Sequence, residues 1–272
     1  MKDYDLIDTG NGRRLERFGK YILDRPDPEV LWQKTLTEAD WKKAHAIFRD
    51  NWINKNHVPE KWQMEYEGIK FWAKLAPFKH TGVFPEQASQ WNHIHDTLNG
   101  KNANVLNLFA YTGIASLFAA RAGAKVTHLD ASRPAITWAN ENRDLNGMQD
   151  APIRWIIDDA VKFTQREIKR GVKYDAIIMD PPVYGHGPAG EIWDFNKDFP
   201  KLLDNCRQIL SDSPLFVLVN AYAVSSSSTT LANTLQGYFG KLGGTIENGE
   251  LTLKEKSAGR LLSTGIWARW IK

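Results

Sequence analysis

The spacing of hydrophobic residues changes in character near residue 80. Before that point, short apolar runs separated by turn residues are typical of β-strands, namely residues 4–8, 15–23, 62–66 and 69–75. Glu67-Gly68 between the last two runs predicts a tight hairpin. Apolar residues at helical spacing, with Thr37 as a cap, predict one helix over residues 38–51. We therefore expect residues 1–78 to form a small β-rich module.

From about residue 90 onward, buried-type strands alternate with helices. The expected strands are residues 105–108, 125–129, 153–157, 174–179 and 215–219. The expected helices are residues 114–122 and 134–146, with two more near 160–170 and 199–210. Such alternation is typical of parallel βαβ units, in which ligands bind at the carboxyl ends of the strands. We expect residues 79–272 to form a Rossmann-like α/β domain, with helices on both faces of its sheet.

Composition narrows the class of protein. The chain is 42% hydrophobic and 25% charged, as in ordinary globular proteins, and no apolar run approaches the length of about 20 residues that spans a bilayer. The single cysteine, Cys206, excludes an intramolecular disulfide. His93, His95 and His128 have no acidic neighbours at metal-ligand spacing, so we expect no metal. With no secretory signal at the N-terminus, we expect a cytoplasmic protein without a membrane segment.

The net charge of +3 says little about partners unless the charges cluster. One local cluster stands near the N-terminus, formed by Arg13, Arg14, Arg17, Lys20 and Arg25. A solvated hairpin surface and a surface that contacts an RNA backbone are both compatible with it.

A turn follows the first strand of the α/β region and leads into a helix. It contains Asn107, Phe109, Tyr111, Thr112 and Gly113. Glycine lets the backbone approach a ligand closely, and a helix N-terminus favours a negatively charged group such as a carboxylate. The segment holds one glycine instead of G-x-G-x-x-G, which argues against a dinucleotide cofactor.

Acidic residues end the second and third strands of this region. Asp130, before Ala131 and Ser132, stands where a carboxylate holds the ribose of a nucleoside, about 20 residues after the turn. Capping of the next helix is the alternative role for Asp130.

The third strand ends in Asp158-Asp159-Ala160. A carboxylate here can accept a hydrogen bond from the exocyclic amine of adenine, and Ala160 can line the ring. Helix capping is again the alternative, and we expect one of the two aspartates to do only that.

The fourth strand delivers Asp180-Pro181-Pro182, followed after Val183 by Tyr184. Two prolines after a buried strand fix a rigid turn, because proline cannot extend the sheet. Such a turn can present the Asp180 carboxylate and the Pro181 carbonyl to an amine or ring N–H, while Tyr184 stacks on a planar substrate. His186, in the loop that follows, is either a general base or a solvent-exposed side chain.

These motifs together resemble those of class I S-adenosylmethionine-dependent methyltransferases, and most closely the bacterial 23S rRNA methyltransferase-like group with its D-P-P-x-aromatic motif. The resemblance covers residues 78–272 and includes the segment 81–87. It implies S-adenosylmethionine as the cofactor, with Phe84, Gln87, Phe109 and Tyr111 lining its pocket. It also implies an RNA substrate, with Asp180, Pro181, Pro182 and Tyr184 as the catalytic group.

Carbon-5 methylation of a pyrimidine requires a cysteine nucleophile. Cys206 lies in an expected helix away from the strand ends, so we expect a small core residue there. For a nucleobase substrate, this favours methylation of a nitrogen. A methyltransferase acting on a small molecule or protein side chain, and a binding module without catalysis, are the alternatives.

Overall fold

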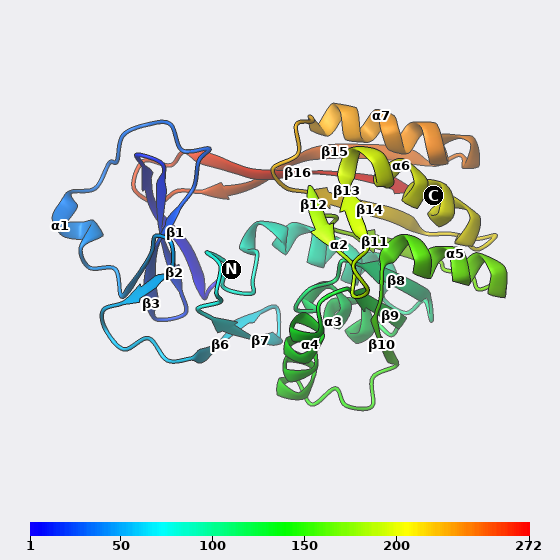
Figure 1. Cartoon of the computed structure of the whole chain (residues 1–272), viewed down its shortest axis with the longest axis horizontal. Coiled ribbons are helices and arrows are strands. Elements are labelled where there is room, and N and C mark those ends of the chain that lie inside the picture. Colours follow the sequence, from blue (N-terminus) through cyan, green and yellow to red (C-terminus); the bar gives the residue numbers. More distant parts are fainter. The chain divides into compact units, whose positions relative to one another are not determined.

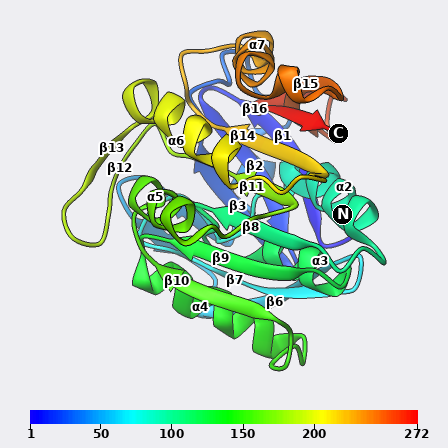
Figure 2. The ribbon, with the colours of Figure 1, turned by 90° about the vertical axis from the view of Figure 1, so that its right-hand side faces the viewer.

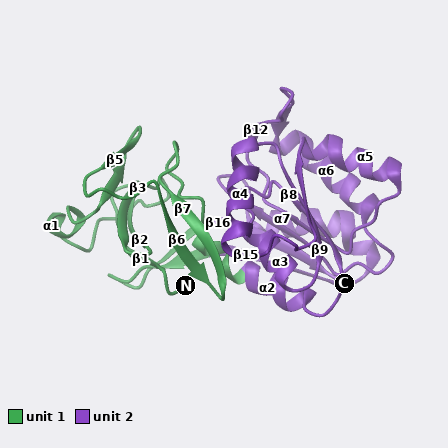
Figure 3. Ribbon diagram, turned by 90° about the horizontal axis from the view of Figure 1, so that it is seen from below, with its two compact units in different colours: residues 1–89, 252–264 green, residues 90–251, 265–272 purple.

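The computed structural model describes residues 1–272, and Figure 1 labels its helices and strands. The chain forms two compact units, coloured in Figure 3. Unit 1 consists of Met1–Ser89 and Thr252–Thr264, and unit 2 of Gln90–Leu251 and Gly265–Lys272. The chain therefore leaves unit 2 at Leu251, completes unit 1, and returns.

Unit 1 is rich in β-strands, as the sequence predicts. Its elements are β1 (Tyr4–Gly10), β2 (Arg13–Phe18), β3 (Tyr21–Pro26), α1 (Glu38–Trp41), β4 (Ala46–Phe48), β5 (Trp52–Asn54), β6 (Lys61–Tyr66), β7 (Ile69–Lys74) and the 3-10 helix η1 (Pro85–Gln87). Strands β1 to β5 form one sheet in sequence order, and β6 pairs with β7. The turn at Glu67 (φ 47°) and Gly68 (φ 77°) confirms the predicted hairpin.

The predicted helix over residues 38–51 is wrong beyond its first turn. Thr37 caps α1 as expected, but α1 ends at Trp41. The His45 N–H then donates to the Ile22 carbonyl at 2.7 Å, and β4 pairs in parallel with β3. Pairing with a strand distant in sequence outweighs the local helical spacing, and Ile47 suits a strand because it is β-branched.

Carboxylates of unit 1 pair with the four arginines of the N-terminal cluster, whereas Lys20 of the same cluster is exposed. Arg13 pairs with Asp24 at 2.6 Å, and Arg17 pairs with Asp5 at 2.6 Å. Arg14 and Arg25 are buried and both contact Glu16, at 3.2 and 2.7 Å. The four arginines thus form an ion-pair network within unit 1, and only Lys20 keeps the solvated position that the sequence allowed.

Unit 2 holds a seven-stranded sheet that confirms the expected Rossmann-like α/β fold. Its elements are α2 (Ala88–Leu98), β8 (Asn104–Leu108), α3 (Ile114–Arg121), β9 (Lys125–Asp130), α4 (Arg133–Leu145), β10 (Ile153–Ile157), α5 (Ala160–Arg170), β11 (Ala176–Met179), β12 (Tyr184–His186), β13 (Ile192–Asp194), α6 (Phe195–Ile209), β14 (Phe216–Ala221), α7 (Ser228–Phe239), η2 (Gly240–Leu242), β15 (Thr245–Lys254) and β16 (Leu261–Ile271). The strand order is β10-β9-β8-β11-β14-β16-β15. Five strands are parallel, and β16 runs antiparallel to β14.

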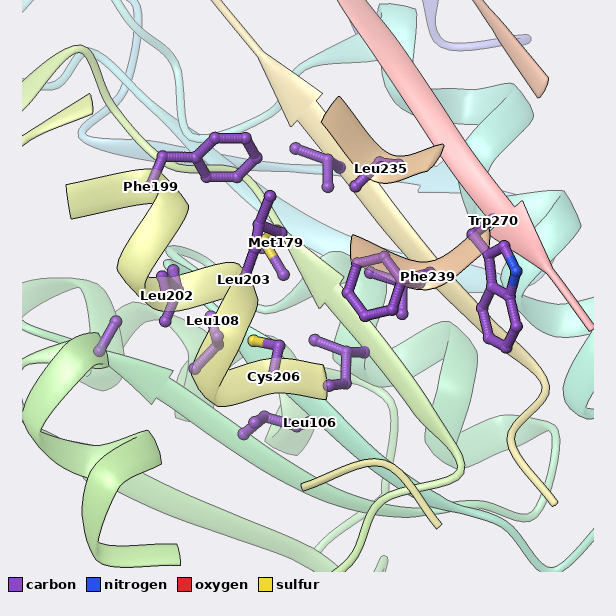
Figure 4. Close-up of a cluster of buried hydrophobic side chains, with 14 of the residues drawn as sticks. Leu106, Leu108, Met179, Phe199, Leu202, Leu203, Cys206, Leu235, Phe239 and Trp270 are labelled. Atoms are coloured by element: carbon purple, nitrogen blue, oxygen red, sulfur yellow. The ribbon is translucent and has the colours of Figure 1, made fainter. Parts of the chain in front are cut away.

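Figure 2 shows helices on both faces of this sheet, and alternate residues of β8, β11 and β14 enter two separate cores. Leu106, Ile177 and Val217 face helices α5, α6 and α7, whereas Val105 and Ile178 face α2 and α3. Figure 4 shows the first core, with the α6 and α7 side chains packed over β8 and β11. Cys206 lies fully buried in it, which confirms the expected core position. None of the helices has the length and apolar character needed to cross a membrane.

Candidate functional site

A cavity of about 300 Å³ lies at the carboxyl ends of β8 to β11 in unit 2. Strand β8, the first strand of the sheet along the chain, lies between β9 and β11. The chain adds β9 and β10 on one side of β8 and then β11 and β14 on the other, so the topology switches at β8. Ligands bind at such switch points in open α/β sheets. The lining residues are Phe109, Leu129, Asp130, Ala131, Ser132, Asp158, Asp159, Ala160, Asp180, Pro182, Gly185, His186, Gly187 and Trp193.

The turn after β8 holds three left-handed residues at alternate positions. Their φ angles are 54° at Phe109, 47° at Tyr111 and 81° at Gly113. A left-handed backbone conformation is unfavourable for a residue that has a Cβ. Residues strained in this way concentrate at functional sites. The turn is held by the Ala110 N–H, which donates to the Leu129 carbonyl at 3.0 Å. It directs the Phe109 ring into the cavity wall.

A chain of buried hydrogen bonds supports this turn from beneath. Asn107, at the end of β8, donates from its side-chain amide to Ser116 Oγ at 2.9 Å. Ser116 Oγ lies 2.9 Å from His128 Nδ1, and Asn142 donates to the Thr112 carbonyl at 2.9 Å. Burial lowers the pKa of His128 to about 3, so this imidazole is neutral at physiological pH. Asn107 therefore ties the end of β8 to α3 through Ser116, while Asn142 holds the turn itself at Thr112.

Gly113→Ala is expected to destabilise the protein and to weaken cofactor binding. A Cβ at Gly113 would lie 3.0 Å from Ala139 Cβ and 3.3 Å from the His128 ring, at a φ of 81°. The left-handed conformation alone costs about 1–2 kcal/mol for a residue with a Cβ. Gly147→Ala is the matched control, since Gly147 is also left-handed (φ 63°) but a Cβ added there would meet no atom within 4 Å. Equal effects of the two variants on Tm and cofactor affinity would contradict this prediction.

Asp130 ends β9 with both carboxylate oxygens held by the backbone. One oxygen accepts from the Tyr111 N–H at 2.8 Å and the other from the Ser132 N–H at 2.8 Å. Burial raises the pKa of Asp130, and these two donors partly oppose the rise. Ser132, whose hydroxyl accepts from the Ala135 N–H at 3.3 Å, is the side chain that caps α4. Asp130 is consequently oriented by the turn and remains on the cavity wall.

The two aspartates after β10 have different surroundings. Asp159 caps α5, because its carboxylate accepts from the Lys162 N–H at 2.8 Å. Asp158 forms an ion pair with Arg166 and accepts from the Asp159 N–H at 2.9 Å. The capping role expected for one of the pair thus falls on Asp159, and Asp158 is the better candidate for a ligand contact.

The turn Asp180-Pro181-Pro182 begins where β11 ends, with the Asp180 N–H 3.4 Å from the Leu108 carbonyl. Trp193 fixes the far side of the turn by donating from Nε1 to the Pro182 carbonyl at 2.6 Å. The same indole packs against Phe109, with 4.9 Å between ring centroids. Trp193 therefore joins the cofactor turn to the proline turn, a role that no local sequence signal indicated.

The segment after the proline turn is a β-hairpin of β12 and β13 instead of the flexible loop that the sequence suggests. Figure 2 shows this hairpin extending away from the sheet. His186 and the glycines on either side of it line the cavity. Tyr184 is 55% exposed and its ring packs edge-on against His186, with 5.3 Å between centroids. Tyr184 does not line the cavity. It lies next to the cavity because its ring contacts His186, which does line it.

The structure gathers about half of the sequence-predicted site residues on one wall. Those on the wall are Phe109, Asp130, Ala131, Ser132, Asp158, Asp159, Ala160, Asp180 and Pro182. Asn107, Tyr111, Thr112 and Gly113 instead shape the turn behind Phe109, while Pro181 is buried in the proline turn. Phe84 and Gln87 belong to unit 1, at the start and end of η1, and their part in the cofactor site stays a prediction.

The chemistry of this wall fits S-adenosylmethionine. Carboxylates suit ribose hydroxyls and an adenine amine, and the wall presents Asp130 and Asp158 for these contacts, in addition to the capping Asp159 and to Asp180 at the proline turn. The aromatic rings of Phe109 and Trp193 supply apolar area for a purine and for the methylene groups of the ligand. The wall holds no lysine or arginine side chain that would favour a pyrophosphate instead.

Comparison with known proteins agrees with this chemistry. A family model described as S-adenosylmethionine-dependent methyltransferase matches residues 44–229. The S-adenosylmethionine-dependent methyltransferase from Agrobacterium tumefaciens has a solved structure that is 41% identical, with a TM-score of 0.96, covering 99% of this chain and 90% of that one. A structure 20% identical, SMU.776 complexed with SAH, shares the fold with a TM-score of 0.71, covering 96% of this chain and 72% of that one.

Two curated relatives are named for ribosomal RNA. The ribosomal RNA large subunit methyltransferase K/L of Shewanella frigidimarina is 36% identical over 57% of this chain and 22% of its own length. The ribosomal RNA large subunit methyltransferase K of Neisseria meningitidis is 30% identical over 78% of this chain and 63% of its own length. This chain thus spans less than two thirds of each of these relatives. Since the family model covers more than half of the chain, the protein belongs to the S-adenosylmethionine-dependent methyltransferases and is an enzyme of that family.

Proposed function

We propose that this enzyme transfers the methyl group of S-adenosylmethionine to a nitrogen of a ribosomal RNA base, in the cytoplasm. The observation that carries the proposal is the proline turn after β11, which places Asp180 on the wall of the cofactor cavity. The names of the curated relatives support the choice of ribosomal RNA as substrate.

The proline turn suits an N–H donor. The Pro182 carbonyl accepts from Trp193, which leaves the Asp180 carboxylate and the Pro181 carbonyl as the acceptors that we propose for the substrate. A base amine can therefore donate one hydrogen to the Asp180 carboxylate and another to the Pro181 carbonyl. Bound S-adenosylmethionine supplies a methyl group that is already electrophilic. Asp180 orients the nitrogen and accepts the proton that it releases, and this positioning supplies much of the rate enhancement.

Tyr184 is proposed to stack on the target base. Its ring is 55% exposed at the first position of β12, and the neighbouring Val183 and Ile192 are also exposed. An exposed aromatic ring beside a reaction cavity is a sequence-tolerant platform for a nucleobase, worth about 1–3 kcal/mol per base. The backbone pairing of Tyr184 with Asp194 holds the platform in a defined position.

Within the cofactor site, Asp130 is proposed to hold the ribose hydroxyls and Asp158 the adenine amine. Ala160 and Phe109 line the purine, and Phe84 and Gln87 contribute as the family resemblance implies. The proposal for Asp130 rests on its fixed carboxylate orientation, and that for Asp158 on the capping role of its neighbour.

Carbon methylation through a cysteine nucleophile does not suit this chain. Cys206, the only cysteine, is fully buried among the side chains of the α6 core (Figure 4). Burial also raises the pKa of its thiol, so the nucleophilic thiolate is disfavoured. Nitrogen methylation needs no covalent intermediate and agrees with the proline turn.

Ribosomal RNA from a strain that lacks this gene is expected to accept methyl groups from the purified enzyme, whereas RNA from the parent strain is not. The measurement is transfer of a radiolabelled methyl group, followed by identification of the methylated nucleoside. RNA binding is expected to weaken steeply with added salt, because phosphate contacts release counterions. No transfer to the undermethylated RNA, or binding that is insensitive to salt, would favour a small-molecule or protein substrate.

A further inference from the structure

Unit 1 contains a second cavity, of about 350 Å³, that the methyl-transfer site does not use. It is lined by Arg13, Asp24, Lys34, Glu38, Trp41, Lys42, Ile47, Arg49 and Lys55. The residues come from β2, β3, α1 and β4 and from the segments that flank them. All of them belong to unit 1, so the cavity is a feature of that unit alone.

The lining is strongly positive. Five of its side chains are cationic and two are carboxylates. The resulting excess of three positive charges is as large as the net charge of the whole chain, +3. A local excess of positive charge around one hollow indicates an anionic ligand.

Two of the five cations already use both carboxylates. Arg13 donates to Asp24 at 2.6 Å and to the Phe48 carbonyl at 2.8 Å. Lys34 pairs with Glu38 at 2.7 Å, and its ammonium lies 4.2 Å from the centre of the Trp41 ring. Both carboxylates of the wall are thus already in ion pairs, and the charge of Lys55 acts on Asp24 only at longer range.

Lys42, Arg49 and Lys55 are exposed and have no ion-pair partner in the protein. This distinguishes them from the arginines of the N-terminal hairpin, where Arg14, Arg17 and Arg25 all have carboxylate partners. Within one unit, the structure neutralises one group of cations and leaves another group unpaired around a hollow.

The three unpaired cations stand on fixed backbone. Lys42 is the C-cap residue of α1, and the antiparallel pairing of β4 with β5 brings Arg49 and Lys55 onto adjacent segments. The Lys55 N–H donates to the His45 carbonyl at 2.9 Å, which ties its segment to the start of β4. The floor is also fixed, because the buried Trp41 donates from Nε1 to Asp8 at 2.8 Å.

We propose that this cavity binds phosphate groups of the RNA backbone, and that Lys42, Arg49 and Lys55 make the contacts. The inference rests on the proposed RNA substrate, and it adds the place in unit 1 at which the RNA backbone binds. Lysine and arginine neutralise backbone phosphates without reading sequence, so the cavity increases affinity and leaves base selection to the site in unit 2.

The test is binding of a fluorescently labelled oligoribonucleotide, measured by anisotropy over a range of salt concentrations. The variant carries Lys42→Gln, Arg49→Gln and Lys55→Gln together, and the three exposed positions leave the fold intact, as Tm verifies. The matched control is Lys43→Gln, because Lys43 adjoins Lys42 but pairs with Asp40 at 2.7 Å and lies outside the cavity.

The triple variant is expected to bind the oligoribonucleotide about tenfold or more weakly, and its salt slope should fall by about 2, since each contact with a single strand contributes about 0.7. Lys43→Gln is expected to behave as the wild type, and all variants are expected to bind S-adenosylmethionine equally. In methyl transfer to ribosomal RNA, the triple variant is expected to show a higher KM for RNA at an unchanged kcat.

Wild-type affinity and salt slope in the triple variant would overturn the inference while leaving the proposed function standing. Competition by inorganic phosphate or polyglutamate as effective as by unlabelled RNA would also overturn it, by assigning the cavity to a free anion or an acidic peptide. Loss of RNA binding in the triple variant, together with no methyl transfer by the wild type, would instead retain the cavity and reject the proposed function.

Discussion

Asp180→Asn is expected to lower kcat for methyl transfer by about 10²- to 10⁴-fold, the range that a positioned acid–base group contributes. Asparagine keeps the size of the side chain, but its amide cannot accept the proton released by the substrate nitrogen. It can also present an N–H toward the substrate amine, where a hydrogen-bond acceptor is needed. Affinity for S-adenosylmethionine, measured by calorimetric titration, is expected to stay at the wild-type value.

Asp212→Asn is the matched control, because it makes the same chemical change at an exposed loop position away from the cavity. It is expected to retain wild-type kcat. If Asp180→Asn and Asp180→Ala both keep full turnover on the methylated RNA, then Asp180 does not orient the acceptor, and the central step of the proposed mechanism fails.

Glu16→Gln is expected to reduce the free energy of unfolding by about 3–5 kcal/mol, the cost of removing one partner from a buried ion pair. The Glu16 side chain is fully buried and contacts Arg14 at 3.2 Å and Arg25 at 2.7 Å, and it also accepts from the Tyr4 hydroxyl at 2.8 Å. Without the Glu16 charge, two buried guanidinium groups lose their shared partner. Urea unfolding followed by tryptophan fluorescence measures the change.

The effect of this substitution is expected to depend on pH. Burial by itself would raise the pKa of Glu16, but the charges of Arg14 and Arg25 outweigh it and lower the pKa. A carboxyl whose pKa is lowered on folding stabilises the protein above its unfolded value of about 4.3, and this contribution disappears as the pH falls through the folded value. The difference between wild type and Glu16→Gln should therefore be full at neutral pH and shrink below about pH 4.

Glu38→Gln serves as the comparison for an exposed pair. The Glu38 side chain is 71% exposed and pairs with Lys34 at 2.7 Å, so its loss is expected to cost less than about 1 kcal/mol. A change of similar size in the two variants would mean that burial of the Glu16 network contributes nothing to stability.

The parallel sheet was predictable because each of its strands has a strong local signature. Residues 153–157 form β10 as predicted, and the predicted end of the fourth strand agrees with β11 at Met179. Every residue of β11 is buried. A continuous apolar run close to prolines can be recognised as a buried strand without knowledge of distant contacts. The positions of the carboxylates at the strand ends followed from these strands. The carboxyl ends of parallel strands lie at one edge of the sheet, so residues that end the strands come together there.

The structure of unit 1 depends on contacts that local spacing does not encode. Residues 42–48 have helical spacing, but their pairing with β3 decides the outcome. The sequence did contain a signal for the arginine network, namely nearby acidic residues, but the net charge alone does not reveal it. Each strand of the hairpin carries an acidic residue beside an arginine. The register sets Arg14 opposite Arg25, and Glu16 lies two residues along β2 from Arg14 and diagonal to Arg25. Counting the carboxylates strand by strand would have indicated internal pairing.

Two features of the cavity had no local signal. Phe109 and Tyr111 are left-handed although neither is glycine, because the surrounding hydrogen bonds impose the turn. Trp193 reaches the Pro182 carbonyl only because β13 folds back along β12. When a hairpin brings a residue to a site, the role of that residue can be assigned only once the hairpin is known.

Unit 1 is assembled from both ends of the chain, and this has a consequence for synthesis on the ribosome. The Thr9 N–H and hydroxyl donate to Glu255 at 2.5 and 2.6 Å, and Asp8 accepts from the Ser257 hydroxyl at 2.5 Å. Asp8 and Glu255 are both buried, and each receives hydrogen bonds from the far segment in addition to donors from its own end of the chain, Trp41 for Asp8 and Arg260 for Glu255.

At translation rates of about 5–20 residues per second, the first strand waits roughly 10–50 s for these partners. Domains usually fold as units from the N-terminus during synthesis. Here unit 1 completes its contacts only after unit 2 has been synthesised, because residues 252–264 follow most of unit 2 along the chain. A nascent chain that ends before Thr252 is thus expected to expose the edge of β1 to chaperones until residues 252–264 have emerged.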